Sequence, residues 1–181
     1  MPKHAGASGH PAEEPVRPVD YDPTWPERFE LERRALVAAI GGFVVDGVHH
    51  VGSTAVPGLA AKPIIYILVG VESLEASRPC GSLVTPLGYQ YFPYRAEEMH
   101  WFCKPDPGHR THHLHLVPAR SERFSGELAF RDYLRSHPEV SAAYTRLKRG
   151  PAARFSEDRE EYTRAKAPFV EQVLRLALGE V

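Results

Sequence analysis

The sequence predicts an α+β domain in which a small mixed β-sheet is flanked by helices and the C-terminal third is helical. Two observations support this class. Segments with strand patterns fall in the first two thirds of the chain, and segments with helical periodicity fill the rest. A length of 181 residues fits one domain with a sizeable core. We assign residues 1–18, which are rich in Gly, Pro and Ala and lack aromatics, to a disordered tail, and residues 19–181 to a single domain.

The first helix is predicted from the stretch DPTWPERFELERRALVAAIGG. Thr24 and Glu27 have the spacing of a capping box, and Pro26 fits the first turn, where its missing N–H costs nothing. The pair Gly41-Gly42 is expected to end the helix.

Strand patterns follow. Residues 43–51 (FVVDGVHHV) predict strands broken by a turn at Asp46-Gly47. The run IIYILVGV is apolar almost throughout and rich in β-branched residues, which is typical of a strand covered on both faces. A short helix is expected over residues 72–80 and a further strand at GYQYFPY. The segments MHWFCK and HHLHLVP predict a hairpin across PDPGHRT.

The rest of the chain is predicted to be helical. Residues 122–136 carry apolar side chains at helical spacing, and His137-Pro138 breaks that helix before PEVSAAYTRLKRG begins another. A last helix is expected from about Asp158 to Leu178, with Asp158 and Glu161 as signals for its start.

Composition excludes several classes of protein. The chain is 43% hydrophobic and 25% charged, and its formal net charge is −1, so nucleic acid is an unlikely partner. No apolar run reaches the roughly 18 residues of a membrane span, and the four prolines among the first twenty residues do not resemble a secretory signal. Because no apolar run is long enough, we expect no membrane partner. The two cysteines form no disulfide framework, so we expect a cytoplasmic protein. No Walker loop, dinucleotide fingerprint or G-x-S-x-G elbow is present.

The stretch Gly52-Ser53-Thr54 is a candidate anion site. A glycine after a strand lets backbone N–H groups converge, and the two hydroxyls add donors for a phosphate. Lys62, ten residues after Gly52, offers a flexible positive charge to the same ligand. The alternatives are a plain turn and a solvated surface lysine, and the residues alone leave them open.

The strand that follows carries Tyr66 on the same face as Leu68. Metal-dependent phosphoryl transfer needs carboxylate oxygens, and this strand has none. A phenol, with an ordinary pKa near about 10, stays neutral at pH 7 and is a poor magnesium ligand. Tyr66 can donate a hydrogen bond, stack on a base or close the pocket; it is equally well explained as a half-buried core aromatic.

Histidines are concentrated in the middle of the chain, because seven of the ten lie between His49 and His115. On a strand, His113 and His115 share one face, so the pair can hold a divalent metal or a phosphate. A third ligand would have to be His49, His50 or His100. The alternative is a pair of histidines bonded to neighbouring polar groups in a cleft.

Several linked motifs resemble the GrpB-like family, whose fold is that of the nucleotidyltransferase superfamily. They are YDPTWPERFELERRAL, HHVGSTAVPGLAAKPIIYILVGV, HHLHLV, FRDYLRSHPE, YTRLK and FSEDREEYTRAKAPFV, and they cover about Val19 to Leu178 in order. The resemblance implies a nucleotidyltransferase-like fold and a Gly-Ser turn, at Gly52 and Ser53, ahead of a strand whose acids hold metal and triphosphate.

The resemblance also implies residue roles and one departure. The family reads KPIIDI where this chain reads KPIIYI, so Tyr66 stands at the family aspartate, and Leu68 stands where the superfamily has a second acid. His50, His113 and His115 match family positions and become candidate catalytic residues together with Tyr66. Losing one preorganised electrostatic contact costs roughly 3–4 kcal/mol of transition-state stabilisation, so the departure weighs against ordinary two-metal transfer.

Three functions remain open. The first is an enzyme acting on a nucleotide or another small anionic molecule, with histidine or metal assistance. The second is a catalytically inactive ligand-binding domain that uses Tyr66 to stack on or cap its ligand. The third is a partner-docking domain, because family relatives resemble domains fused to dephospho-coenzyme A kinase; its protein partner is unknown.

Overall fold

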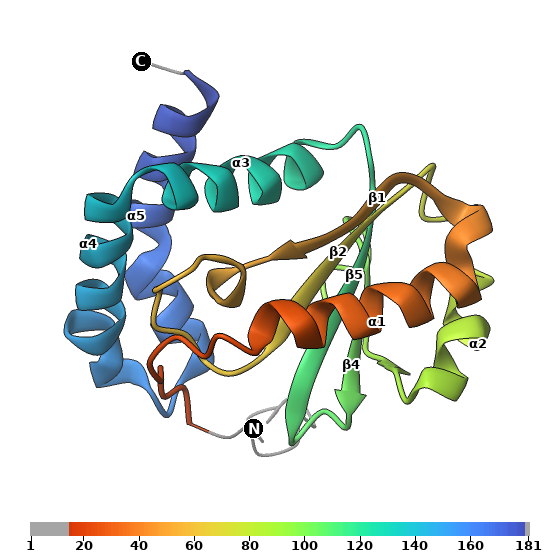
Figure 1. Cartoon of the computed structure of the whole chain (residues 1–181), viewed down its shortest axis with the longest axis horizontal. Coiled ribbons are helices and arrows are strands. Elements are labelled where there is room, and N and C mark those ends of the chain that lie inside the picture. Colours follow the sequence, from red (N-terminus) through yellow and green to blue (C-terminus); the bar gives the residue numbers. More distant parts are fainter. Residues whose placement is uncertain (1–14, 180–181) are drawn as a thin grey trace, which may run out of the picture.

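A five-stranded sheet in the order β1-β2-β5-β4-β3 forms the centre of the computed structural model, which describes residues 15–179 (Figure 1). Strands β2 and β5 are parallel, whereas the other neighbours are antiparallel, so the predicted mixed sheet is confirmed. The strands are β1 (Val44–Val51), β2 (Ile65–Val71), β3 (Gln90–Tyr91), β4 (His100–Pro105) and β5 (Arg110–Pro118).

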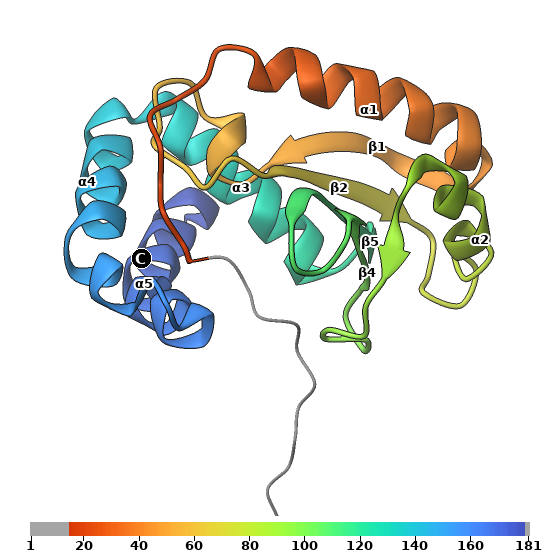
Figure 2. The ribbon, with the colours of Figure 1, turned by 90° about the horizontal axis from the view of Figure 1, so that it is seen from below.

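Helices cover both faces of this sheet. Figure 2 shows α1 on one side of the strands, α3 on the other, and α4 and α5 beside the end of the sheet where β2 begins. The helices are α1 (Trp25–Ile40), α2 (Cys80–Val84), α3 (Glu122–Ser136), α4 (Pro138–Arg149) and α5 (Arg159–Leu178). The α+β class with a helical C-terminal third is therefore confirmed.

Strand β2 is buried on both faces, as its apolar run predicts. Ile65 and Ile67 belong to the core cluster that contains Leu36 and Ile40 of α1. Leu68 points to the opposite face and packs in a second cluster with Phe124 of α3. Tyr66 lies at the edge of that second cluster, so it faces away from α1.

Two predictions near the start of the chain are wrong in detail. Residues 44–51 form one strand with pairing irregularities at Asp46, because Gly47 adopts a φ of 66° within the ladder and the strand continues past it. The capping box of α1 is not formed. Thr24 has helical backbone angles, and its N–H donates to Asp22 Oδ1 at 2.8 Å instead.

The short helix predicted over residues 72–80 occurs later, at Cys80–Val84. In the preceding stretch, Ser73 Oγ accepts from the N–H of Ala76 at 3.1 Å, and Ser77 Oγ donates to the carbonyl of Ser73 at 2.9 Å. Such side-chain bonds satisfy the backbone in turns and compete with helix formation. The strand expected at GYQYFPY is reduced to the two residues of β3.

The predictions for the rest of the chain are confirmed. Strands β4 and β5 form the expected hairpin. The Asp158 side chain caps α5 by accepting from the N–H of Glu161 at 3.0 Å. Cys80 and Cys103 are buried free thiols. Within the described part of the chain, no helix combines the length and apolarity needed to cross a membrane.

The segment ahead of α1 crosses the molecule beside the C-terminal helices. Val19 pairs with Ala61 in an isolated antiparallel bridge, and the N–H of Val16 donates to the carbonyl of Ser156 at 2.8 Å. The predicted tail, residues 1–18, falls mostly on residues 1–14, which lie outside the described residues.

Candidate functional site

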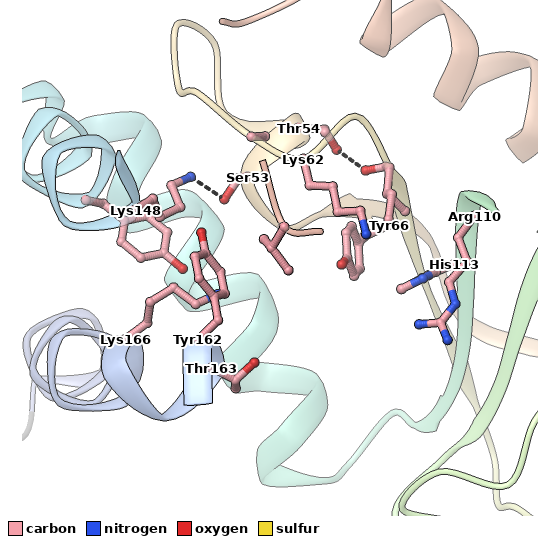
Figure 3. A pocket seen from close by; sticks show the side chains of 15 residues that line it. Ser53, Thr54, Lys62, Tyr66, Arg110, His113, Lys148, Tyr162, Thr163 and Lys166 are labelled. Atoms are coloured by element: carbon pink, nitrogen blue, oxygen red, sulfur yellow. Dashed lines mark hydrogen bonds between the residues drawn. The ribbon is translucent and has the colours of Figure 1, made fainter. Parts of the chain in front are cut away.

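A cavity of about 250 Å³ lies between the end of the sheet and the C-terminal helices (Figure 3). Its walls come from five parts of the chain: the segment before α1, the turn and loop between β1 and β2, the two strands β2 and β5, helix α4 and helix α5. The lining residues are Val16, Gly52, Ser53, Thr54, Ala61, Lys62, Ile64, Tyr66, Arg110, His113, Tyr144, Lys148, Tyr162, Thr163 and Lys166.

The turn after β1 begins with Gly52, whose φ of 72° and ψ of −173° belong to a region that only glycine occupies readily. A Cβ at this position would lie 3.3 Å from the Tyr66 ring. Glycine therefore permits both the turn and the close approach of Tyr66. The following 3₁₀ turn, Ser53–Ala55, presents Ser53 to the cavity.

Ser53 is bonded to a lysine that lies 95 positions later in the chain. Lys148 Nζ donates to Ser53 Oγ at 2.9 Å and also donates to the carbonyl of Ala60. The Lys148 side chain is almost fully buried, at 3% exposure, and its Nζ lies 4.4 Å from the centre of the Tyr144 ring. Burial, followed by the positive charges of Lys166 and Arg149, lowers the pKa of Lys148 to about 7.

The lining is strongly cationic. Lys62, Arg110 and Lys166 accompany Lys148 around the cavity, and no Asp or Glu side chain is among the described lining residues. Arg110 Nε donates to the carbonyl of Pro107 at 2.7 Å, and its guanidinium lies 5.0 Å from the centre of the Trp101 ring. Figure 3 shows these cations approaching from different walls, so the space between them suits an anion.

Tyr66 and His113 are neighbours within the cavity wall, because they are directly paired residues of the parallel strands β2 and β5. The ring of His113 is 1% exposed and also contacts Trp101. His115, two pairs further along and opposite Leu68, lies beyond the lining. Its Nδ1 is 3.8 Å from Glu127 Oε2 on α3. Burial opposes ionisation of Glu127, but His115 and Arg123 outweigh it and lower the pKa of that carboxyl.

His50 lies on the opposite face of the sheet. Its ring stacks on Phe29 of α1, with the ring centres 4.8 Å apart, and it lines a separate pocket of about 320 Å³ with Arg131 and Arg135. Burial, then the charges of Arg135 and Arg131, lower the pKa of His50 to about 4, so its imidazole is neutral at pH 7.

Thr54 links His50 to the cavity side of the turn. Its Oγ1 donates to the carbonyl of Ile64 at 3.0 Å, and His50 Nε2 lies 3.0 Å from the same oxygen. Because a hydroxyl has only one proton, Thr54 must accept from His50, which places the imidazole proton on Nε2. The Thr54 hydroxyl therefore holds the turn against the following loop.

The candidate third metal ligands do not converge on His113 and His115. His49 Nε2 lies 2.8 Å from the carbonyl of Asp46, and His100 Nε2 lies 2.7 Å from that of Leu74. Among the residues that the structure describes, no three His, Cys, Asp or Glu side chains are grouped to hold a metal. The lining also lacks the carboxylates that Mg²⁺ requires, so these residues do not fit magnesium.

Six of the eight residues predicted from the sequence line one cavity: Gly52, Ser53, Thr54, Lys62, Tyr66 and His113. His50 and His115 lie outside it. The sequence interpretation missed Arg110 and the contribution of α4 and α5. The stretch YTRLK, which includes Tyr144 and Lys148, and the stretch EEYTRAK, which includes Tyr162 and Lys166, were the available signals. Each places an aromatic and a lysine at i and i+4 on one helix face.

Comparison with known proteins agrees with the architecture. The family described as "GrpB protein" matches residues 15–176, which is most of the chain. The chain belongs to the GrpB family. It superposes on the crystal structure of the conserved protein GrpB from Enterococcus faecalis with a TM-score of 0.81 and 33% identity, covering 91% of this chain and 98% of that one.

Sequence similarity to curated relatives extends over similar spans of the chain. The chain is 34% identical to the glutamate-rich protein GrpB of Alkalihalophilus pseudofirmus, covering 86% of this chain and 92% of that protein. It is 40% identical to a UPF0157 protein of Pseudomonas aeruginosa over 87% of its own length. It spans 66% of that relative's length, slightly less than two thirds.

Proposed function

We propose that the cavity binds a small molecule with several negative charges, such as pyrophosphate or the phosphate groups of a nucleotide. The observation that carries the proposal is the lining, in which four basic side chains meet and no carboxylate is found among the described residues. Placing positive charges around one space costs free energy through their mutual repulsion, and an anion between them offsets that cost.

The cavity volume favours a compact ligand. About 250 Å³ is slightly less than the roughly 300–1,000 Å³ of pockets that enclose drug-sized molecules. A phosphate chain fits such a space, and a base or another group of the ligand would extend from its opening. Hydroxyls of Ser53 and Tyr66 line the same space and can donate to phosphate oxygens.

The proposal differs from metal-dependent nucleotidyl transfer in how the ligand is neutralised. In this chain, lysine and arginine side chains would supply the positive charge that a carboxylate-bound metal supplies elsewhere. Binding would then survive in the presence of a chelator. Binding of the anion requires no reaction at its phosphate groups, so binding and reaction can be measured independently.

Isothermal titration calorimetry with pyrophosphate, tripolyphosphate and ATP, each in the presence of EDTA, tests the proposal. We expect binding that weakens with added salt, because ionic contacts are screened. Lys62→Gln and Lys166→Gln should each weaken binding about tenfold or more, since a hydrogen bond to a charged group contributes roughly 1.5–3 kcal/mol.

Arg164→Gln is the matched control for Lys166→Gln. Arg164 lies two positions away on α5, pairs with Glu161 and is 70% exposed at its side chain. Its loss removes the same charge without touching the cavity lining. Equal affinities for the wild type, Lys62→Gln and Lys166→Gln, or no binding of any of the three anions, would contradict the proposal.

A further inference from the structure

The hydrogen bond between Ser53 and Lys148 joins a hydroxyl to an amine at the wall of the cavity (Figure 3). A serine that only bound phosphate through its O–H would not require a buried amine on its oxygen. A lysine that only bound phosphate would not need both a serine oxygen and a backbone carbonyl as partners for its amine, as Lys148 has. The arrangement instead resembles a nucleophile with an adjacent base.

The surroundings of Lys148 disfavour its ammonium form. In the described part of the chain, no ion pair joins Lys148 to a carboxylate, and the charges that act on its pKa are those of Lys166 on α5 and Arg149 on α4. Burial is the largest cause of the lowered pKa, and it outweighs the favourable contact of Nζ with the Tyr144 ring at 4.4 Å. With a pKa of about 7, a large fraction of the amine is neutral at physiological pH and has a lone pair that can accept a proton.

The amine is also oriented. One N–H donates to the carbonyl of Ala60, which fixes the Nζ atom beside Ser53 Oγ. When the amine is neutral, Ser53 can donate its O–H to the lone pair, in the reverse sense of the bond that the ammonium makes. A serine paired with a lysine in this way is a known variant of the nucleophile–base arrangement on unrelated folds.

We propose that Ser53 is a nucleophile and Lys148 its general base, acting on a phosphoryl group of the anion held in the cavity. This inference rests on the proposed function. Ser53 Oγ forms a bond to phosphorus while its proton passes to Lys148 Nζ. The bond from phosphorus to the leaving oxygen breaks, and that oxygen keeps the electron pair and takes the proton from Lys148. The products are phosphoserine at position 53 and the released alcohol or phosphate.

The choice of a phosphoryl group follows from the lining. Negative charge stays on the non-bridging oxygens throughout phosphoryl transfer, and cations aimed at them stabilise the transition state. Lys62, Arg110 and Lys166 are placed around the same cavity as Ser53. They would therefore hold the phosphoryl oxygens while the pair Ser53 and Lys148 carries out the substitution.

A small dialkyl fluorophosphate tests the nucleophile without knowledge of the natural ligand. Attack by Ser53 displaces fluoride and leaves a stable phosphoester, which peptide mass spectrometry locates. We expect labelling at Ser53, with a rate that rises between about pH 5.5 and about pH 8.5 as Lys148 loses its proton. Ser141, a buried serine whose Oγ donates to the carbonyl of Leu134, should stay unlabelled in the same digest.

Two variants complete the test. Ser53→Ala should abolish the label at this position, and Lys148→Met should slow labelling of Ser53 about 100-fold or more, the usual contribution of a general base. An unchanged rate in folded Lys148→Met would overturn the assignment of the base. If that variant fails to fold, a labelling rate of the wild type that does not change with pH would overturn the same assignment.

The outcome separates this inference from the proposed function. No label at Ser53, in a protein that binds pyrophosphate, would refute the nucleophile and leave the anion site intact. Pyrophosphate should compete with the probe and protect Ser53. A labelled Ser53 in a protein that binds none of the anions would refute the proposed function instead.

Discussion

Tyr66 and His113 are directly paired residues of neighbouring parallel strands, and their ring centres lie 4.6 Å apart at an interplanar angle of 71°. Tyr66 stands where the resemblance to the GrpB family implies an aspartate. A carboxylate in this place would lie beside the imidazole, in a cavity lined by four basic side chains. Tyr66 thus brings no negative charge to this wall of the cavity.

Tyr66→Asp should make anion binding depend on a divalent metal. The new carboxylate repels phosphate when no metal is present, and it offers Mg²⁺ one oxygen ligand while the phosphates supply others. We expect weaker pyrophosphate binding in EDTA and recovery in Mg²⁺, measured by calorimetry. Tyr66→Phe is the control and should bind nearly as the wild type does in both conditions. Identical behaviour of the two variants would show that position 66 does not face the anion.

Gly52→Ala should weaken both folding and anion binding. The new Cβ would lie 3.3 Å from the Tyr66 ring, at backbone angles that cost roughly 1–3 kcal/mol for other residues. Gly58→Ala is the matched control, because Gly58 also has a positive φ, 77°, but a methyl group added there would meet nothing within 4 Å. We expect urea denaturation to show a larger loss for Gly52→Ala and calorimetry to show weakened binding for it alone.

Thr54→Val should lower the free energy of unfolding by about 1–3 kcal/mol. The change keeps the shape of the side chain but leaves His50 Nε2 and the carbonyl of Ile64 without their partner in a buried place. Urea denaturation measures the loss. Thr85→Val, at an exposed threonine whose Oγ1 donates to the carbonyl of Gly81, should cost much less. Equal losses would mean that the bonds of Thr54 do not hold the turn.

Lys148→Met should change how stability depends on pH. Lys148 has a pKa of about 7 in the folded protein, lowered by burial from its ordinary value of 10.5. Between these values the unfolded chain binds a proton that the folded protein does not, so the contribution of Lys148 to the free energy of unfolding falls as the pH decreases. We expect the stability of Lys148→Met relative to the wild type to increase as the pH falls from about 10 to about 7. Below about pH 7 this difference should stay constant.

Denaturation in urea at several pH values gives this difference directly. Losing the bonds to Ser53 and Ala60 changes the difference in the free energy of unfolding by the same amount at every pH. The proton linkage of Lys148 makes that difference vary with pH. A difference that stays constant with pH would show that Lys148 titrates normally in the folded protein.

The turn and the two central strands of the site could be predicted from the sequence because their signals are local. Gly52, Ser53 and Lys62 follow one strand pattern, and alternation within each strand places Tyr66 on the face of Leu68 and His113 on the face of His115. His50 could not be placed in this way. Its pairing with Ile67 turns it toward α1. The sequence of one strand alone does not determine which residues it pairs with on the next strand.

The cations of the C-terminal part escaped prediction for a different reason. Lys148 and Lys166 lie on helices whose sequences read as ordinary charged surfaces, and only tertiary packing turns them inward. Lys148 is buried because Tyr144 beside it joins a core cluster with Leu59 and Leu134. The local signal is the tyrosine four residues before each lysine, and this spacing alone does not determine which helix face packs inward.

Val16 forms part of the cavity wall, and its N–H is bonded to Ser156 in the connection that leads into α5. The stretch ahead of α1 therefore adjoins both the cavity and the C-terminal helices. An environment-sensitive dye attached beside Val16 would change its emission when the cavity fills, so this stretch offers a place for an optical reporter that leaves every cationic side chain of the lining intact.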